Sequence, residues 1–157
     1  MLFVKDQTGN YQQAPDEVVL NAALQVSKSH LQSGIFIKSP DNAKDAIAAQ
    51  LCGRTQEVFG CLFLDSQHRI LKWTIMFFGT VNRNVVYPRE IIKEALRYNA
   101  AAVVIAHNHP SGGITPSSDD IHLTKELVKI LNLVDVKVLD HLIVGDEIAS
   151  FKELGFI

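Results

Sequence analysis

The chain has 157 residues, of which 47% are hydrophobic and 20% are charged, a composition typical of one soluble globular domain. Its net charge of −2 gives no general reason to expect a nucleic-acid or membrane partner. Two cysteines are too few for a disulfide framework, and we expect Cys52 and Cys61 to be small buried residues. The sequence shows neither a signal peptide nor the ~20-residue apolar run of a membrane helix, so we expect a cytoplasmic protein.

Helical signals dominate the first third of the chain. Residues 1–14 are mixed and polar, and we expect partial order there at best. Pro15 opens a predicted helix that Gly34 ends. Residues 39–41 (Ser-Pro-Asp) predict a second helix start, with a capping hydroxyl, a proline and an acid in the first turn, and Gly53 stops this helix.

The pattern changes to that of a strand at residues 56–65. Phe59, Cys61 and Phe63 share one face, and the alternate residues, which are also apolar, share the other. Because both faces are apolar, we predict a central strand that is covered on both sides. Residues 70–78 are predicted to be its hairpin partner.

The second half of the chain alternates between helices and buried strands. We predict a helix that Pro88 opens, a strand at 101–106, a helix at 118–131 and a strand at 136–144, followed by a turn into a short tail. The buried stripe of the helix after Pro88 is predicted to be Ile91, Ile92, Ala95 and Leu96. Helices interleaved with apolar strands predict an α/β fold, a single-domain α/β/α sandwich around a mixed sheet.

Two histidines follow one another at the end of a buried strand. His107 and His109 are two residues apart, so the alternation of a strand points both imidazoles to the same side. Pro110 and a pair of glycines then turn the chain back, which can bring Asp120, in the first turn of the next helix, alongside them. Two imidazoles and one carboxylate suit zinc, and three protein ligands leave the fourth tetrahedral position to water, as in catalytic sites.

Each of these residues also has an ordinary structural interpretation. A histidine pair at a strand end is by itself weak evidence for a metal, and Ser117 and Asp120 are spaced as a helix cap, which is compatible with a ligand mounted there. His122 is an alternative third ligand. His141, in an apolar strand, is interpreted as a hydrogen-bonded core histidine, and Asn108 as a structural residue that points to the opposite face.

A hydrolytic metal site needs a base that takes a proton from water and passes it to the leaving group. Glu57 stands out among the carboxylates because it begins an apolar strand, on the face of Phe59 and Phe63. A buried glutamate is costly without a counter-charge, a metal or a task. The alternative is an ordinary strand-edge glutamate in solvent, and the pattern alone leaves both interpretations open.

Several separated blocks, in order and spacing, resemble the RadC-like family of JAMM (MPN-type) zinc metalloproteases. His107 and His109, then seven residues, Ser117, two residues and Asp120 match the JAMM motif. Further blocks resemble RadC-like chains in particular, namely residues 57–59, 64–65, 79–80, 88–90, 99–112 and 140–144. The resemblance is close over 57–144 and looser back to Ser39. We therefore assign residues 39–157 to a RadC-like domain and residues 1–38 to an N-terminal extension with one helix.

The resemblance implies a fold similar to that of cytidine deaminases and a zinc-dependent hydrolase that cleaves a peptide or isopeptide-like amide bond. It implies one Zn²⁺ per chain, with His107, His109 and Asp120 as ligands. It also implies Glu57 as the general acid/base, and Ser117 as a hydroxyl that helps to stabilise an oxyanion. The implied partner is a peptide or protein substrate; we expect no membrane partner, and a homo-oligomer is left open.

Two departures from the family pattern bear on function. RadC-like chains often have Asp-Pro where this chain has Gly113 and Ile114, which concerns substrate preference more than the metal. Residues 1–38 contain no glycine-rich hairpin with basic flanks, the DNA-associated segment of longer members. The alternative function is a non-catalytic protein- or DNA-binding module of a DNA-repair or mobile-element protein. Its support would come from Arg83, Arg89, Lys93 and Arg97, with Trp73 and Tyr87 if these are exposed.

Overall fold

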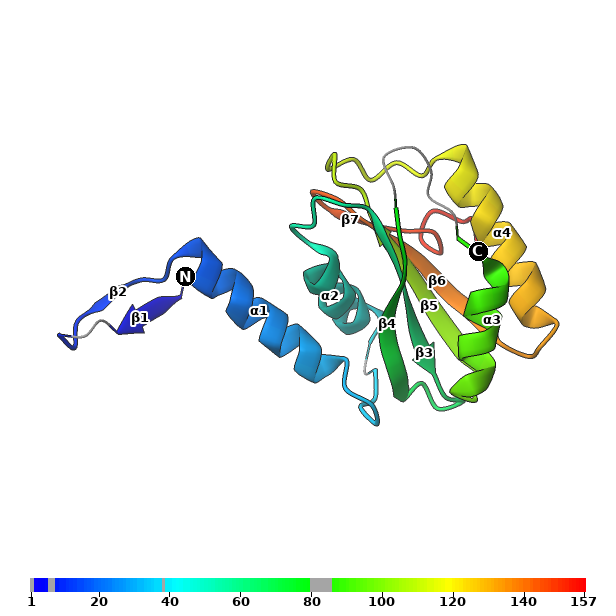
Figure 1. Cartoon of the computed structure of the whole chain (residues 1–157), viewed down its shortest axis with the longest axis horizontal. Coiled ribbons are helices and arrows are strands. Elements are labelled where there is room, and N and C mark those ends of the chain that lie inside the picture. The colour runs from blue at the N-terminus through cyan, green and yellow to red at the C-terminus, as the bar shows by residue number, and fades with distance from the viewer. Residues whose placement is uncertain (1, 6–7, 38, 80–85) are drawn as a thin grey trace.

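A computed structural model describes residues 2–5, 8–37, 39–79 and 86–157 of the chain. Figure 1 shows a sheet with helices on both faces, and an arm, made of the first helix and a two-stranded hairpin, that projects from it. The helices within the described residues are α1 (Asp16–His30), α2 (Pro40–Leu51), α3 (Pro88–Arg97) and α4 (Ser118–Asn132). The strands are β1 (Phe3–Lys5), β2 (Tyr11–Gln13), β3 (Val58–Leu64), β4 (Ile70–Phe78), β5 (Ala102–Asn108), β6 (Lys137–Val144) and β7 (Ile148–Ser150).

The main sheet has five strands in the order β4-β3-β5-β6-β7. Strands β5 and β6 run parallel, and the other neighbours are antiparallel. The parallel pair is joined by the crossover helix α4, the usual connection between parallel strands. The predicted mixed sheet and α/β class are therefore confirmed.

Strand β3 is covered on both sides, as its sequence predicts. All seven of its residues are buried. Val58, Leu62 and Leu64 pack in one cluster with residues of α2, whereas the alternate side chains pack with residues of α3 and α4 on the opposite face. Figure 1 shows α2 on one side of the sheet and α3 and α4 on the other. The helices cover the two faces of the sheet. A site can therefore form at the edge of the sheet where β3 begins and β5 ends.

Two expectations about burial are wrong. Cys52 is exposed rather than buried, because it caps the C-terminal end of α2, beyond the last residue that faces the sheet. Leu96 is 58% exposed, whereas Ile91 and Ala95 are fully buried. At about 100° per residue, Leu96 lies roughly 140° around the helix from Ile91, and so falls outside the buried stripe.

The ends of the chain contain strands that the sequence did not predict. Strands β1 and β2 pair as an antiparallel hairpin where only partial order was expected, and β7 adds an edge strand where a turn into the tail was expected. Helix α1 begins after Pro15, which is its N-cap, and ends at His30, before the predicted Gly34. No helix among the described residues has the length and apolarity that crossing a membrane requires.

Candidate metal centre

The two histidines lie where β5 ends, in the middle of the sheet. His107 is paired on one side with Phe59 of β3 and on the other with Ile143 of β6. The backbone N–H of His109 donates to the carbonyl of Val144 (2.9 Å), so the chain stays anchored one residue beyond the strand. The His107 side chain is only 3% exposed and that of His109 is 19% exposed. The site is thus rigid at its base and open to solvent at one side.

A tight loop returns the chain from the histidines to α4. The N–H of Gly112 donates to the carbonyl of His109 (3.0 Å), and the N–H of Asp146 donates to the carbonyl of Gly112 (2.8 Å). Gly112 has φ +85°, and a Cβ there would lie 2.7 Å from the Asp146 carboxylate oxygens. Because φ is positive, any side chain at this position would be strained, and the Asp146 carboxylate would also have to move, so the turn favours glycine.

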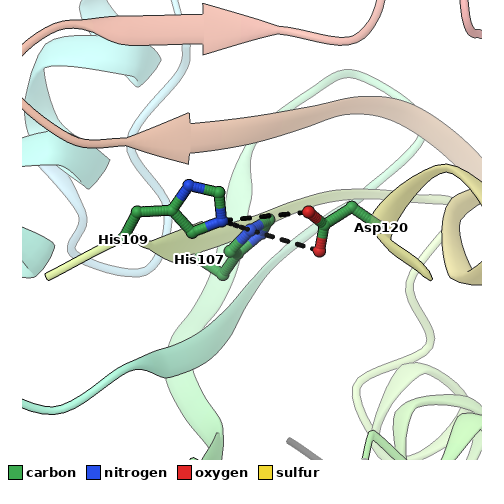
Figure 2. Close-up of side chains that lie close together, drawn as sticks. All are labelled: His107, His109 and Asp120. Carbon is green, nitrogen blue, oxygen red and sulfur yellow. Dashed lines mark hydrogen bonds and ion pairs between the residues drawn. The ribbon is translucent and has the colours of Figure 1, made fainter. Parts of the chain in front are cut away.

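Asp120 is held by a capping box at the start of α4. The N–H of Ser117 donates to Asp120 Oδ2 (2.8 Å), the Ser117 hydroxyl donates to the same oxygen (2.6 Å), and the N–H of Asp120 donates back to that hydroxyl (3.1 Å). The cap interpretation of Ser117 is thereby confirmed. Figure 2 shows the Asp120 carboxylate pointing at the two imidazoles. Its oxygens lie 3.4 Å from Nε2 of His107 and 3.8 Å from Nε2 of His109.

The hydrogen bond of His109 fixes where its proton resides. Nδ1 of His109 lies 2.8 Å from the carbonyl oxygen of Gly113. A carbonyl only accepts hydrogen bonds, so Nδ1 carries the proton and donates. In the neutral imidazole, Nε2 of His109 is then an unprotonated nitrogen with a lone pair.

A buried chain of hydrogen bonds fixes His107 in the same way. The hydroxyl of Thr124 donates to the backbone carbonyl of Asp120 (2.6 Å). Having one proton, it must accept from Nδ1 of His141, 2.6 Å away. Nε2 of neutral His141 then accepts from Nδ1 of His107 (2.8 Å), which leaves Nε2 of His107 with a lone pair. We call these residues, Thr124, His141 and His107, the relay.

Burial favours the neutral form of both relay histidines. It lowers the pKa of His107 to about 4, although Asp120 acts in the opposite direction. It also holds the pKa of His141 well below its usual range. The close approach of His107 to Asp120 would be an ion pair only if the imidazole were protonated. Because burial outweighs the attraction of Asp120, the imidazole is neutral at pH 7 and its Nε2 lone pair is available.

Three electron-pair donors therefore converge without a proton between them. Nε2 of His107 and Nε2 of His109 are 3.0 Å apart, beside the Asp120 carboxylate (Figure 2). Two nitrogens bound at 2.0–2.1 Å to one tetrahedral zinc are separated by about 3.3 Å. The three side chains form a group whose ligand atoms all lie within 4.8 Å of one another. These residues fit a divalent metal, because a cation would relieve the repulsion among their lone pairs.

Asn108 points away from the metal group and joins β3 to β5. Its Oδ1 accepts from the N–H of Val58 (2.8 Å), and its Nδ2 donates to the carbonyl of Gln56 (3.2 Å). The predicted structural role of Asn108 is thus confirmed. Its side chain fastens the start of β3 beside the histidines.

We expect Asn108→Ala to destabilise the fold by about 1–3 kcal/mol, because it leaves the buried N–H of Val58 without an acceptor. Urea unfolding measures the change. Asn132→Ala, at the exposed end of α4, is the matched control and should change the free energy of unfolding by less than about 0.5 kcal/mol. Equal unfolding midpoints for the two variants would show that the Asn108 side chain does not hold this strand end.

Glu57 lies at the same end of the sheet as the histidines. The antiparallel pairing of Phe59 with His107 places Glu57 level with His109, and strand alternation gives Glu57 the face of Phe59. The Phe59 ring stacks on the His107 ring, with 6.4 Å between centroids. Glu57 is half-buried, and its carbonyl accepts from the N–H of Gly79 (2.8 Å). Glu57 therefore lies immediately before β3 rather than in it, on the side of the sheet that alternation assigns to His107.

The other residues considered from the sequence as ligands or core histidines have different places in the structure. His122, the alternative third ligand, is exposed and is not in the group. His141 is a hydrogen-bonded core histidine, as predicted, but its bond to His107 was not foreseen. Thr124 was missed altogether. The available signal was its spacing, since it follows Asp120 by four residues, about one helical turn, and so lies on the same face of α4.

The basic residues that support the alternative function are mostly engaged in exposed ion pairs. Arg89 and Lys93 pair with Glu90 (3.2 and 3.0 Å), and Arg97 pairs with Glu94 (3.4 Å). Among the other supporting residues, Tyr87 is 54% exposed and Trp73 is half-buried, whereas Arg83 lies outside the described residues. The pairing with glutamates leaves little free positive charge on α3.

Comparison with known proteins gives one family and many relatives. The RadC-like JAB domain matches residues 37–156. The chain is 47% identical over 138 residues to UPF0758 protein RSc2444 of Ralstonia nicotianae. This match covers 87% of the chain and 62% of that protein. It is 46% identical over 143 residues to a UPF0758 protein of Pseudomonas fluorescens, covering 88% of this chain and 64% of the relative. The chain thus spans less than two thirds of the length of these relatives.

Proposed function

The chain belongs to the RadC-like JAB domain family, and we propose that it is a zinc-dependent hydrolase that cleaves a peptide or isopeptide-like amide bond. The observation that carries this proposal is the convergence of the two Nε2 lone pairs of His107 and His109 on the carboxylate of Asp120. The family match supports the same chemistry.

The exposure of the group favours a catalytic over a purely structural metal. Asp120 and His109 have side chains that are 17% and 19% exposed, so solvent and substrate can approach. Among the described residues, no fourth histidine, cysteine or carboxylate joins the group. Structural zinc sites are usually closed by four protein ligands, whereas catalytic sites keep a position open.

Each residue then has a distinct task. Zinc, when bound, acts as a Lewis acid that polarises the substrate carbonyl and activates water. Glu57 accepts the proton of the attacking water and returns it to the leaving amine. The hydroxyl of Ser117 donates a hydrogen bond to the carboxylate of Asp120 and so holds it in place. To stabilise an oxyanion, that hydroxyl must turn from the carboxylate to the substrate oxygen.

The relay gives a prediction that does not depend on the substrate. Thr124→Val removes the acceptor for Nδ1 of His141, so the tautomer of His107 is no longer fixed. Because Thr124 acts on His107 through His141, we expect zinc affinity to fall by about 10-fold, the lower end of the cost of disturbing the hydrogen bonds around a metal ligand. Competition with a chelator at constant pH measures the affinity, and ¹⁵N NMR of the imidazoles reports the tautomer. Thr115→Val, at an exposed position in the loop before α4, is the control, and equal affinities for the two variants would refute the relay.

The proposed activity is tested with the zinc-loaded chain and a library of peptides and isopeptide-linked peptides, with cleavage detected by mass spectrometry. We expect cleavage that a chelator abolishes and added zinc restores. A folded chain that holds one zinc and cleaves no member of the library would contradict the hydrolase assignment and favour the non-catalytic binding module.

A further inference from the structure

Helix α1 presents an apolar face that nothing in the described chain covers. Val18, Val19 and Val26 are 42%, 36% and 56% exposed, and Ala22 and Ala23 between them are exposed as well. At 100° per residue, these five residues share one side of the helix. We call them the α1 stripe. Burying such a stripe is favourable by roughly 25 cal/mol per Å², so its exposure indicates an interaction surface.

The side of α1 next to the α1 stripe meets the domain, near the C-terminal end of the helix. Ser27 is buried, and its hydroxyl donates to the carbonyl of Ala46 (2.5 Å), while Nε2 of Gln50 donates to Ser27 Oγ (2.8 Å). Leu31 enters the core cluster of α2. Figure 1 shows the first part of α1 and the hairpin standing away from the sheet. The arm is thus fixed at its base, with the α1 stripe free along its length.

The α1 stripe matches itself when it is read in the reverse direction. Its valines lie at both ends and its two alanines in the middle. A two-fold axis between Ala22 and Ala23 would place Val19 against Val26 of the partner subunit, and Ala22 against Ala23 of the partner subunit. Such a self-complementary patch is what an isologous dimer requires. The small central residues let two helices approach closely.

The charges at the ends of α1 select the antiparallel orientation. The first turn carries Asp16 and Glu17, and the last turn carries Lys28 and His30. Antiparallel pairing sets each acidic end beside a basic end, whereas parallel pairing sets like charges together. Asp16 and His30 are about four turns apart and therefore lie on the same side of the helix. The antiparallel arrangement also pairs opposite ends of the helix dipoles.

The same arrangement gives the hairpin a place to bind. In an antiparallel pair, the chain that precedes α1 of one copy extends past His30 of the other. Beyond that residue lies an apolar pocket of about 260 Å³, lined among others by Leu31, Ile35, Phe36, Ala43, Ala46 and Ile70. The hairpin carries apolar side chains to fill it, since Leu2, Phe3 and Tyr11 are 53%, 55% and 73% exposed.

We propose that the chain forms a two-fold symmetric homodimer through its arm, with α1 antiparallel to α1 of the second copy and each hairpin over the partner's apolar pocket. A stable interface buries about 800 Å² per subunit. Helix α1 is about 22 Å long, so the helix pair supplies the centre of the interface and the two hairpins enlarge it at both ends.

The oligomeric state of the full chain tests the dimer. In sedimentation over a concentration series, the native chain should approach twice its 17.4 kDa mass. Val26→Asp puts a charge against Val19 of the partner subunit, within the apolar helix pair, and should raise the dissociation constant by about tenfold or more. Asn21→Asp, an exposed position on the same helix outside the α1 stripe, is the matched control. A monomeric native chain, or equal effects of the two substitutions, would overturn the proposal.

Cross-linking tests the orientation. Exposed Cys52 is first replaced by serine, and single cysteines are then introduced by Ala22→Cys or Val18→Cys. In the antiparallel dimer, the two copies of position 22 meet at the axis and form a disulfide. The two copies of position 18 lie about 13 Å apart, beyond the ~7 Å that a disulfide spans. Equal cross-linking at both positions would show a parallel pair and overturn the arrangement.

Discussion

Replacing His107, His109 or Asp120 by alanine, one at a time, is expected to remove zinc from the chain in each of the three variants. Structural zinc sites in small peptides contribute about 10–16 kcal/mol of binding free energy, so the loss of one of three protein ligands should weaken binding by about a thousandfold or more. Dialysis against a weak chelator followed by elemental analysis measures the zinc that is retained. Circular dichroism shows whether each variant is folded.

His122→Ala is the matched control for these substitutions. His122 lies two residues after Asp120 on the same helix, but it is exposed and outside the group. The variant should retain its zinc. Loss of zinc from His122→Ala, or full retention by any folded variant of the three proposed ligands, would show that the ligand set is wrong.

Glu57→Gln is expected to separate binding from catalysis. The amide has the shape of the carboxylate but cannot accept a proton, so we expect one zinc to be retained and kcat to fall by about 10²–10⁴. The measurement uses a substrate identified by the peptide and isopeptide library. Glu126→Gln, at an exposed position on α4, should leave kcat unchanged. Native turnover by Glu57→Gln would remove this residue from the mechanism without affecting the metal assignment.

Local patterns in the sequence were sufficient to predict much of the centre of the molecule. The apolar residues on both faces of the segment 56–65 predicted a strand covered on both sides, and the structure confirms it for Val58–Leu64. The spacing of His107, His109 and Asp120 predicted that these residues meet, and they form one group. Both predictions rest on rules that act within one strand or across one short loop, where spacing in sequence fixes position in space.

The relay could not be predicted in this way, because it depends on how distant elements pack. His141 enters it from β6 and Thr124 from α4, and they meet His107 only because β6 runs parallel beside β5 and α4 packs against β6. The apolar strand around His141 predicted its burial. The spacing of Thr124 from Asp120 places it on the same face of α4, but no local pattern shows that it would accept the hydrogen bond of His141.

The ends of the chain show a second limit. Strands β1, β2 and β7 have three residues each, too few to show an alternating pattern. Their formation depends on the strand that they pair with. The α1 stripe is a related case, since Pro15 and the apolar spacing predicted the helix, but spacing alone could not show that this face lies away from the sheet.

Zinc-edge X-ray absorption of the native chain, purified without a histidine tag, tests the central claim most directly. One zinc per chain is predicted, bound by two imidazole nitrogens and by oxygen at about 2.0–2.2 Å, with His107, His109 and Asp120 as the protein ligands. A sulfur shell at about 2.3 Å, which exposed Cys52 would supply, or a folded chain that takes up no zinc, would contradict it.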